Sequence, residues 1–135
     1  MEPMHKGSCL CGAVSFTIEG ELGAPDACHC TMCRKVSGHF WASTDVPRGA
    51  VSISDEGQLG WYRSSGKVRR GFCRNCGSAL FWDGDGRANL AVAMGAIEGP
   101  TGVHLEKHIF VHEKGDYYEI ADGLACHGSS PGEIL

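Results

Sequence analysis

The stretch Cys28-His29-Cys30-Thr31-Met32-Cys33 places three thiols within six residues, with a histidine between the first two. Thiolates at such short spacing are typical ligands of a tetrahedral metal ion. Three donors in one segment close small chelate loops, so we expect Cys28, Cys30 and Cys33 to bind the same ion. The rest of the chain is expected to fold around this segment.

Two further cysteine pairs flank it, Cys9-Leu10-Cys11 and Cys73-Arg74-Asn75-Cys76. Positions i and i+2 of an extended segment point to the same side, so Cys9 and Cys11 can reach one ion. The second pair is a zinc knuckle, in which Gly77 accepts the positive φ of the tight turn. A structural zinc takes four protein ligands and a catalytic zinc three. The seven thiols therefore divide into a closed site and an open one, although spacing alone leaves the reverse allocation open.

Zinc is the ion that all-sulfur tetrahedral sites favour, and an iron–sulfur cluster is its main competitor. We expect two zinc ions, a structural one held by the pairs and a second one held by the central segment. The Cys73–Cys76 spacing also occurs in redox motifs. That alternative is disfavoured because no helix pattern follows the pair and a matching pair lies upstream.

The overall composition indicates a single domain over residues 1–135, with a core of about 7–125. With 20 glycines and 42% apolar residues the core is modest, and a structural metal would supplement it. The 12 basic and 16 acidic side chains disfavour nucleic acid as a partner. No apolar run approaches the roughly 18 residues that span a membrane. The N-terminus lacks a secretory signal, so we expect a cytoplasmic protein with reduced thiols rather than disulfides.

Short alternating segments separated by glycine turns indicate an all-β domain. Residues 1–8 look like a loose start, and a helical turn is expected at 34–38, ending at Gly38. The tail from Gly128 is Gly/Ser/Pro-rich and expected to be mobile. The expected strands are 13–18, 40–43, 51–53, 59–63, 68–72, 79–82, 108–111 and 117–120.

The quoted motifs, together with residues 34–38 and His108-Ile109, resemble the glutathione-dependent formaldehyde-activating enzymes, a family that includes the centromere protein V group. The match in order and spacing covers about residues 7–125. The resemblance implies several short curved antiparallel sheets around zinc knuckles, zinc-ribbon-like, with a structural zinc and a three-cysteine zinc. It also implies a carbon–sulfur lyase that in reverse joins glutathione to formaldehyde as S-hydroxymethylglutathione.

This activity would place the catalytic metal on Cys28, Cys30 and Cys33, with the substrate thiol at the fourth position. His29 either orients substrate and shuttles a proton or packs behind the knuckle. The cations nearest in sequence to the ligands are candidate partners of the tripeptide carboxylates, although solvated charge is the default for each. They are Arg34, Lys35, Arg69 and Arg70.

Several alternatives stay open. Cys126 either closes the second site as a fourth ligand or is a tail thiol without a role, which we favour. His108 is expected to be structural. Tyr117 or Tyr118 stands where the family often has tryptophan. The rival function is a non-catalytic zinc-binding or chaperone-like module in which both metals are structural. The sequence indicates no oligomeric state.

Overall fold

A computed structural model describes residues 3–128, which form two β-sheets with one short α-helix and three 3₁₀ turns. The all-β prediction is therefore confirmed. The helical elements are α1 (Thr31–Ser37), η1 (Arg48–Ala50), η2 (Met94–Ala96) and η3 (Val111–Glu113). The strands are β1 (Met4–Ser8), β2 (Ser15–Glu19), β3 (Asp26–Cys28), β4 (Trp41–Pro47), β5 (Val51–Ser54), β6 (Leu59–Arg63), β7 (Val68–Cys73), β8 (Ala79–Gly84), β9 (Asn89–Ala93), β10 (Lys107–Ile109) and β11 (Ala125–Cys126).

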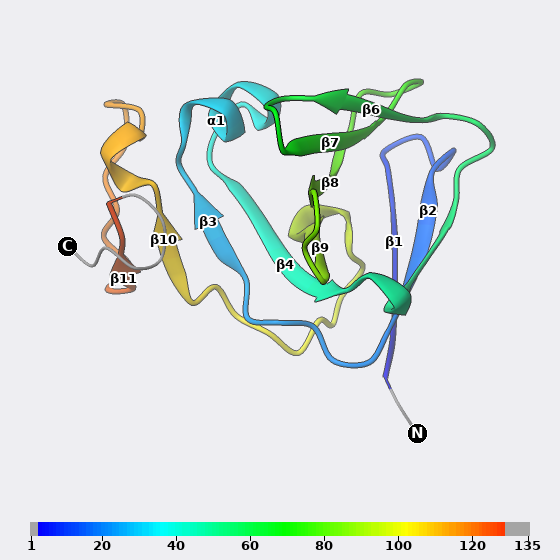
Figure 1. Cartoon of the computed structure of the whole chain (residues 1–135). Helices are drawn as coiled ribbons and strands as arrows, with labels where there is room; N and C mark the ends of the chain where they lie inside the picture. Colours follow the sequence, from blue (N-terminus) through cyan, green and yellow to red (C-terminus); the bar gives the residue numbers. More distant parts are fainter. Residues whose placement is uncertain (1–2, 129–135) are drawn as a thin grey trace.

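The larger sheet curves strongly. It has eight strands in the order β11-β10-β3-β4-β9-β8-β7-β6, and the smaller sheet has the order β1-β2-β5. In Figure 1, β6 and β7 run across the top of the molecule while β3 and β4 descend below them. The pairings of β10 with β3 and with β11 are parallel, which the expectation of antiparallel sheets did not include. The curvature brings α1, at the upper end of β3, next to β7.

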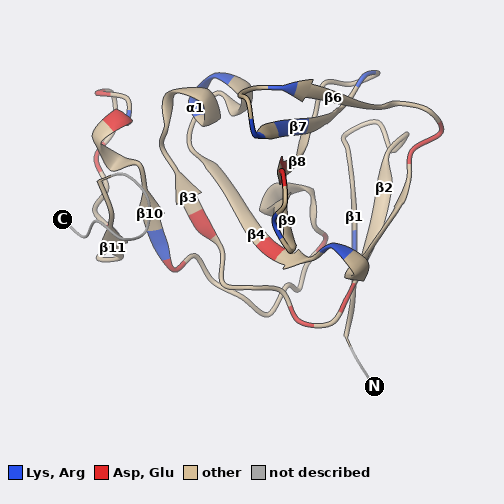
Figure 2. Cartoon of the chain, viewed as in Figure 1, with Lys and Arg blue, Asp and Glu red and all other residues tan. Residues whose placement is uncertain are grey.

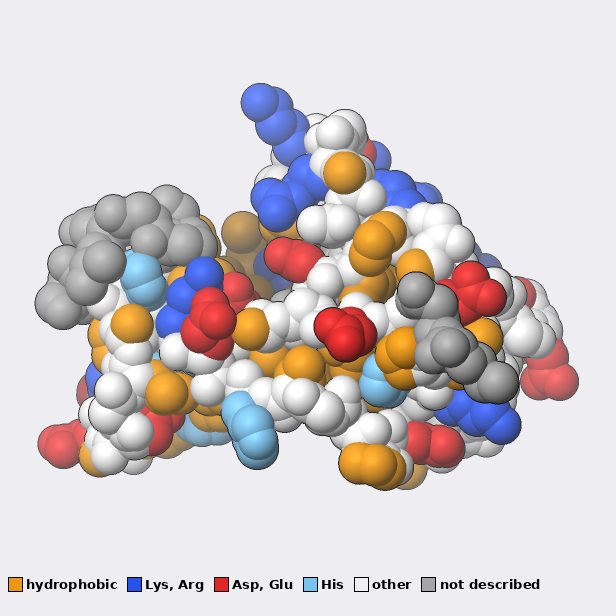
Figure 3. Space-filling model, turned by 90° about the horizontal axis from the view of Figure 1, so that it is seen from below, with side chains coloured by type: hydrophobic (Ala, Val, Ile, Leu, Met, Phe, Trp, Pro, Cys, Tyr) orange, Lys and Arg blue, Asp and Glu red, His pale blue; other side chains and the backbone are white. Residues whose placement is uncertain are grey.

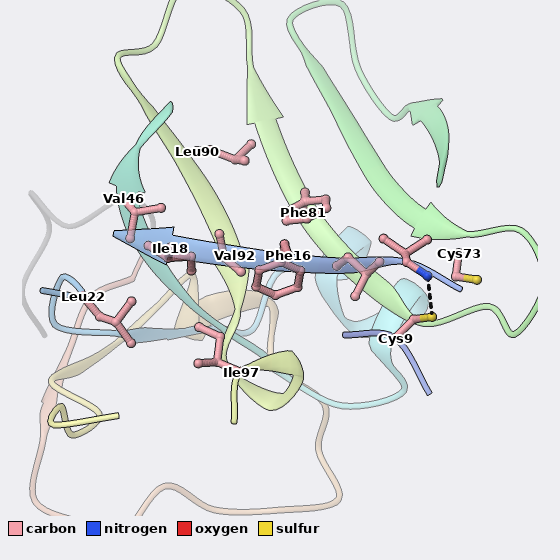
Figure 4. Close-up of a cluster of buried hydrophobic side chains, with 12 residues drawn as sticks. Cys9, Phe16, Ile18, Leu22, Val46, Cys73, Phe81, Leu90, Val92 and Ile97 are labelled. Carbon is pink, nitrogen blue, oxygen red and sulfur yellow. Dashed lines mark hydrogen bonds between the residues drawn. The ribbon is translucent and has the colours of Figure 1, made fainter. Parts of the chain in front are cut away.

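The hydrophobic core lies between the small sheet and the middle of the large one. Phe16 and Ile18 point inward from β2, as residues two apart on a strand must. Figure 4 shows β2 crossing over β8 and β9, with Phe16 close to Phe81 and Ile18 close to Val92. The rings of Phe16 and Phe81 meet edge to face at 5.4 Å. Cys9 and Cys73 lie at one end of this core, so the two flanking cysteine pairs border the core there.

Four local predictions were wrong. Residues 4–8, expected as a loose start, form β1 and pair with β2. Strand β3 is absent from the expected strands, because Gly20, Gly23 and Pro25 just before it are loop signals. The helix begins at Thr31 rather than 34, and residues 117–120 form no strand. The predicted mobile tail is outside the described residues from 129 onward.

Helix α1 is defined by its caps. Cys30 is the N-cap, and its Sγ accepts the N–H of Cys33 at 3.3 Å. Gly38 ends the helix at φ 87° and donates its N–H to the Arg34 carbonyl at 2.8 Å, as the glycine predicted. With seven residues α1 is the longest helix in residues 3–128, and none there is long and apolar enough to cross a bilayer.

The charged side chains on the face shown in Figure 3 are mixed. Several basic side chains gather at the top of this view, and acidic, basic and apolar groups are interspersed over the rest of the part that is coloured by type. The mixture agrees with a net charge of −4, which leaves little basic surplus.

We predict that Asp83→Asn destabilises the fold. The buried carboxylate of Asp83 accepts from Arg48 at 2.5 Å and Arg69 at 2.8 Å. Burial opposes ionisation, but the two guanidinium groups prevail and lower the pKa of Asp83. Since both arginines are half-exposed, we expect a loss of about 1–2 kcal/mol at pH 7, measured by urea unfolding.

The pH dependence has a defined sign. The pKa of Asp83 is lower in the folded state than its unfolded value of about 3.9. The ion pairs of Asp83 therefore stabilise the fold fully above about pH 3.9, and this stabilisation is lost as the pH falls through the folded-state pKa. The difference between wild type and Asp83→Asn should therefore shrink on acidification below about pH 3.9. Asp85→Asn is the control, because Asp85 pairs with Arg63 at 3.1 Å in solvent. Equal effects of the two variants at pH 7 would contradict the prediction.

Candidate active site and metal centres

The first metal centre joins the two flanking cysteine pairs. The sulfurs of Cys9, Cys11, Cys73 and Cys76 all lie within 4.8 Å of one another. The Cys9–Cys11 and Cys11–Cys73 sulfur distances are 3.6 and 3.8 Å. Four sulfurs about 2.3 Å from one zinc would be about 3.8 Å apart at tetrahedral angles. The donor set and its spacing therefore fit a closed four-sulfur site, and the four sulfurs lie together as the expected allocation requires.

The surrounding backbone supplies hydrogen bonds to these sulfurs. Val14 donates its N–H to Cys9 Sγ at 3.3 Å, and the Cys76 N–H reaches Cys73 Sγ at 3.5 Å. The Asn75 side-chain amide donates to Cys11 Sγ at 3.2 Å and lowers its pKa. Gly77 has φ 82°, as its place after the knuckle predicted. These N–H groups favour the thiolate form that binds metal, although burial raises the pKa of Cys73 to about 11.

The second centre has three cysteines. Cys28 ends β3, Cys30 caps α1 and Cys33 lies in its first turn, which brings the three sulfurs within 4.8 Å. Hydrogen bonding to Cys30 raises the pKa of Cys28, while that from Cys28 lowers the pKa of Cys30. Cys30 Sγ also accepts the Cys33 N–H, which favours its thiolate form. The group fits one metal ion and leaves a fourth position for another ligand.

A cavity of about 530 Å³ adjoins this second group and is lined by all three cysteines. Its volume is in the range of small-molecule sites. Trp41 at the start of β4 and Trp82 on β8 line the cavity with their aromatic rings. The other lining residues are Asp26, Thr31, Met32, Ser43, Asp45, Ser64, Ser65, Val68, Arg70, Arg87, Ala91, Ile109, Phe110 and Glu113.

The cavity is lined by charges of both signs. Figure 2 shows basic positions on α1 and β7 and acidic positions on β3 and β4, at opposite ends of this region. Arg70 of β7 is buried beside the sulfurs, and Asp26 and Asp45 line the β3–β4 part. Burial, and then the charge of Asp45, raise the pKa of Asp26. A ligand with a cationic group would therefore find a carboxyl pair at this end.

The four candidate cations take different positions. Arg70 is buried, with 8% of its surface exposed, and it is the one of the four that lines the cavity. Arg69 pairs with Asp83, and Arg34 donates to the Glu113 carbonyl at 2.7 Å. Lys35 is exposed to solvent. The expectation that each cation is a solvated surface charge is thus wrong for Arg70. Strand alternation places Arg69 and Arg70 on opposite faces of β7, and this signal in the sequence could have distinguished their roles.

His29 lies behind the cysteine segment and is fully buried. Its Nδ1 is hydrogen-bonded to the Tyr118 hydroxyl, and its Nε2 lies 2.8 Å from His108 Nδ1. His108 Nε2 reaches the Asp122 carboxylate at 2.7 Å. Burial, and then His108, lower the pKa of His29 to about 4. Because His29 is not part of the cavity wall, the geometry favours the packing role over the catalytic one.

Residues after β10 hold the metal-binding segment in place. The Glu113 carboxylate accepts from the Thr31 backbone N–H at 3.0 Å and from its hydroxyl at 3.1 Å. Sequence reasoning missed this contact and that of Tyr118 with His29, because the contacts join residues 82 and 89 positions apart.

Cys126 lies on β11 with its Sγ 3.7 Å from the Leu124 carbonyl, outside both metal groups. The structure therefore favours the interpretation of Cys126 as a tail thiol without a role over that of a fourth metal ligand.

Known proteins share this sequence pattern and fold. The sequence profile described as glutathione-dependent formaldehyde-activating enzyme matches residues 4–113. An uncharacterised lyase of Schizosaccharomyces pombe is 28% identical over 125 residues, covering 89% of this chain and 88% of its own length. A Halomonas elongata protein with the provisional name of glutathione-dependent formaldehyde-activating enzyme is 33% identical over 145 residues, covering 96% and 90%. A crystal structure of a Rhodobacter sphaeroides protein superposes with a TM-score of 0.60 at 22% identity, covering 72% of this chain and 91% of that one, which shows a shared fold.

Proposed function

The chain belongs to the family of glutathione-dependent formaldehyde-activating enzymes, and on this premise we propose that it is a zinc-dependent carbon–sulfur lyase. Its reaction would form or cleave a thiol–aldehyde adduct such as S-hydroxymethylglutathione. The observation that carries the proposal is the cavity of about 530 Å³ whose wall contains Cys28, Cys30 and Cys33. A purely structural site would have no need of a ligand cavity at its open side.

We assign the structural zinc to Cys9, Cys11, Cys73 and Cys76 and the catalytic zinc to Cys28, Cys30 and Cys33. A zinc ion with an open position lowers the pKa of a thiol that binds there below its usual value of about 8.5. The three cysteines hold this position at the cavity wall. Trp41 and Trp82 line the cavity, so they exclude part of the water around a bound thiol.

Glutathione matches the charges of the cavity. It carries two carboxylates and one ammonium group, and both cations and carboxylates line the cavity. Asp26 and Asp45 can receive the ammonium group, and the raised pKa of Asp26 would fall on contact with this cation. Arg87 lies over the Trp82 ring at 5.1 Å and offers a cation at the edge of the same cavity. These positions support a zwitterionic thiol as substrate.

The experiment measures metal content, thiol binding and turnover of the same protein. We expect two metal ions per chain, and a change in the visible spectrum of the cobalt-substituted protein when glutathione is added. Exchange NMR with ¹³C-formaldehyde should show faster interconversion of free formaldehyde and its glutathione adduct. One metal per chain, or no spectral change at millimolar thiol, would refute the proposal. Two metals without binding or turnover would identify a non-catalytic zinc module instead.

A cytoplasmic location remains part of the proposal. Each of the eight cysteines is a free thiol in the structure. Free thiols at metal-ligand spacing are expected where glutathione and thioredoxin keep the compartment reducing. The same compartment would supply glutathione as substrate. Localisation of a fluorescent fusion would test this expectation.

A further inference from the structure

Arg70 is a buried cation without a carboxylate partner in residues 3–128. It has 8% of its surface exposed, and the ion pairs of the described chain do not include it. A buried charge is costly unless an opposite charge or several hydrogen bonds compensate it. The compensation nearest to Arg70 is the cysteine group, because its Nη1 lies 3.6 Å from Cys33 Sγ. Its charge is therefore directed at the centre where thiolates gather.

The guanidinium group is held in a fixed orientation. Its Nε donates to the Ser64 hydroxyl at 3.2 Å, and its Nη1 points to Cys33. The other terminal nitrogen, Nη2, has no hydrogen-bond partner among the described residues, and the side chain lines the cavity. The planar fork of arginine keeps its donors in fixed relative positions. Arg70 thus offers a free donor to a ligand beside the sulfurs.

The proposed reaction develops negative charge at such a place. When a thiolate sulfur attacks the aldehyde carbon, the S–C bond forms and the C=O π pair moves to oxygen. The resulting alkoxide takes a proton from water and becomes the hydroxyl of the adduct, and cleavage runs through the same steps in reverse. The oxygen is separated from the sulfur by one carbon atom. The substrate sulfur would lie beside the three cysteines, and Arg70 contacts one of them, so its free donor is placed near this oxygen.

We propose that Arg70 stabilises the oxyanion that forms during thiol–aldehyde addition and cleavage. This inference rests on the proposed lyase function and adds a catalytic residue to it. Fixed donors aimed at a developing oxyanion lower its energy more than that of the neutral aldehyde. Arg70 should therefore accelerate the chemical step without strengthening the binding of the thiol.

The other groups near the cavity are less suited to this role. Arg69, on the opposite face of β7, is committed to Asp83 and stacks over Trp61 at 3.9 Å. Arg87 is exposed and stacks on Trp82. The Thr31 hydroxyl donates to Glu113. Among the described cations, Arg70 combines burial, a fixed orientation and contact with the sulfur group.

The test compares Arg70→Met, Arg70→Lys and the control Arg69→Gln. Arg69→Gln also removes a positive charge from β7, but on the face away from the cysteines. Exchange NMR gives the rate of adduct interconversion, and titration of the cobalt-substituted protein gives the affinity for glutathione. For Arg70→Met we expect the rate to fall by about 10²–10³-fold, the usual loss on removing one oxyanion donor, with an unchanged affinity. Arg70→Lys keeps the charge but not the fork, so it should lose less.

The outcomes separate this proposal from the one on which it rests. Wild-type acceleration together with an unchanged rate in both Arg70 variants would overturn the role of Arg70 and leave the lyase function standing. A parallel loss of affinity and rate would also overturn it, because Arg70 would then bind the ground state. If the wild type itself does not accelerate the exchange, the lyase function fails first. If Arg70→Met does not fold, the exchange rate and the glutathione affinity of Arg70→Lys test the role of Arg70 instead.

Discussion

We expect the Cys73→Ser variant to be largely unfolded at room temperature and to show no cooperative transition on heating. Cys73 is fully buried at the edge of the core and shares its metal group with Cys9 and Cys11, more than 60 residues away in sequence. Structural zinc contributes an apparent free energy of about 10–16 kcal/mol in zinc-finger peptides, whereas whole domains are stable by only about 5–15 kcal/mol. A weakened site can therefore remove most of the stability of this chain.

Circular dichroism and calorimetry, with metal analysis, would follow the loss. Cys126→Ser is the matched control, because it removes a thiol that lies outside both metal groups. This control should keep two metals and the wild-type transition. A folded Cys73→Ser protein with wild-type metal content and melting temperature would show that the four-sulfur group is not a structural site. Chelation of wild-type protein should reproduce the unfolding.

The cysteine sites could be predicted because their chemistry is local. Pairs such as Cys9/Cys11 and Cys73/Cys76 carry the ligand spacing within a few residues, and the total of seven thiols limits how they can be shared. The structure brings the two pairs together as that sharing requires. The all-β class also followed from short alternating segments, since period-two alternation is a property of single strands.

The errors concern features that tertiary pairing decides. Strand β1 has little apolar alternation of its own and exists because it pairs with β2 along its whole length. Strand β3 has three residues and is fixed from both sides, by β4 and by the parallel β10. No local pattern in a three-residue segment can indicate such neighbours.

The cavity could be predicted only in part. Asp26 is two residues before Cys28 on β3, so strand alternation alone puts both on one face. Arg70 reaches the cavity because the large sheet curves and brings one end of β7 near α1, and Trp82 is the cross-strand partner of Arg70 on β8. That curvature depends on the whole sheet, including the bulge between Gly71 and Phe72. The charge pattern of the substrate site therefore emerges only in three dimensions.

Cys30→Ala is expected to abolish turnover while leaving the fold intact. Cys30 is one of three sulfurs in the second group and lies at the N-cap of α1, at a distance from the main core. A metal-bound nucleophile or Lewis acid supplies several kcal/mol to a reaction of this kind, which corresponds to a loss of about 10³-fold or more. Metal content should fall from two ions to one, and circular dichroism should stay that of the wild type.

The same variant decides between the two classes of function. If the second site were structural, losing a ligand and the N-cap acceptor would lower the melting temperature as strongly as a change in the first group. If it is catalytic, stability and turnover separate, since the cavity side of α1 contributes little to the main core. Cys126→Ser again provides the control, with unchanged metal content and rate. A Cys30→Ala protein that keeps two metals and wild-type turnover would rule out the three-cysteine group as the reactive centre.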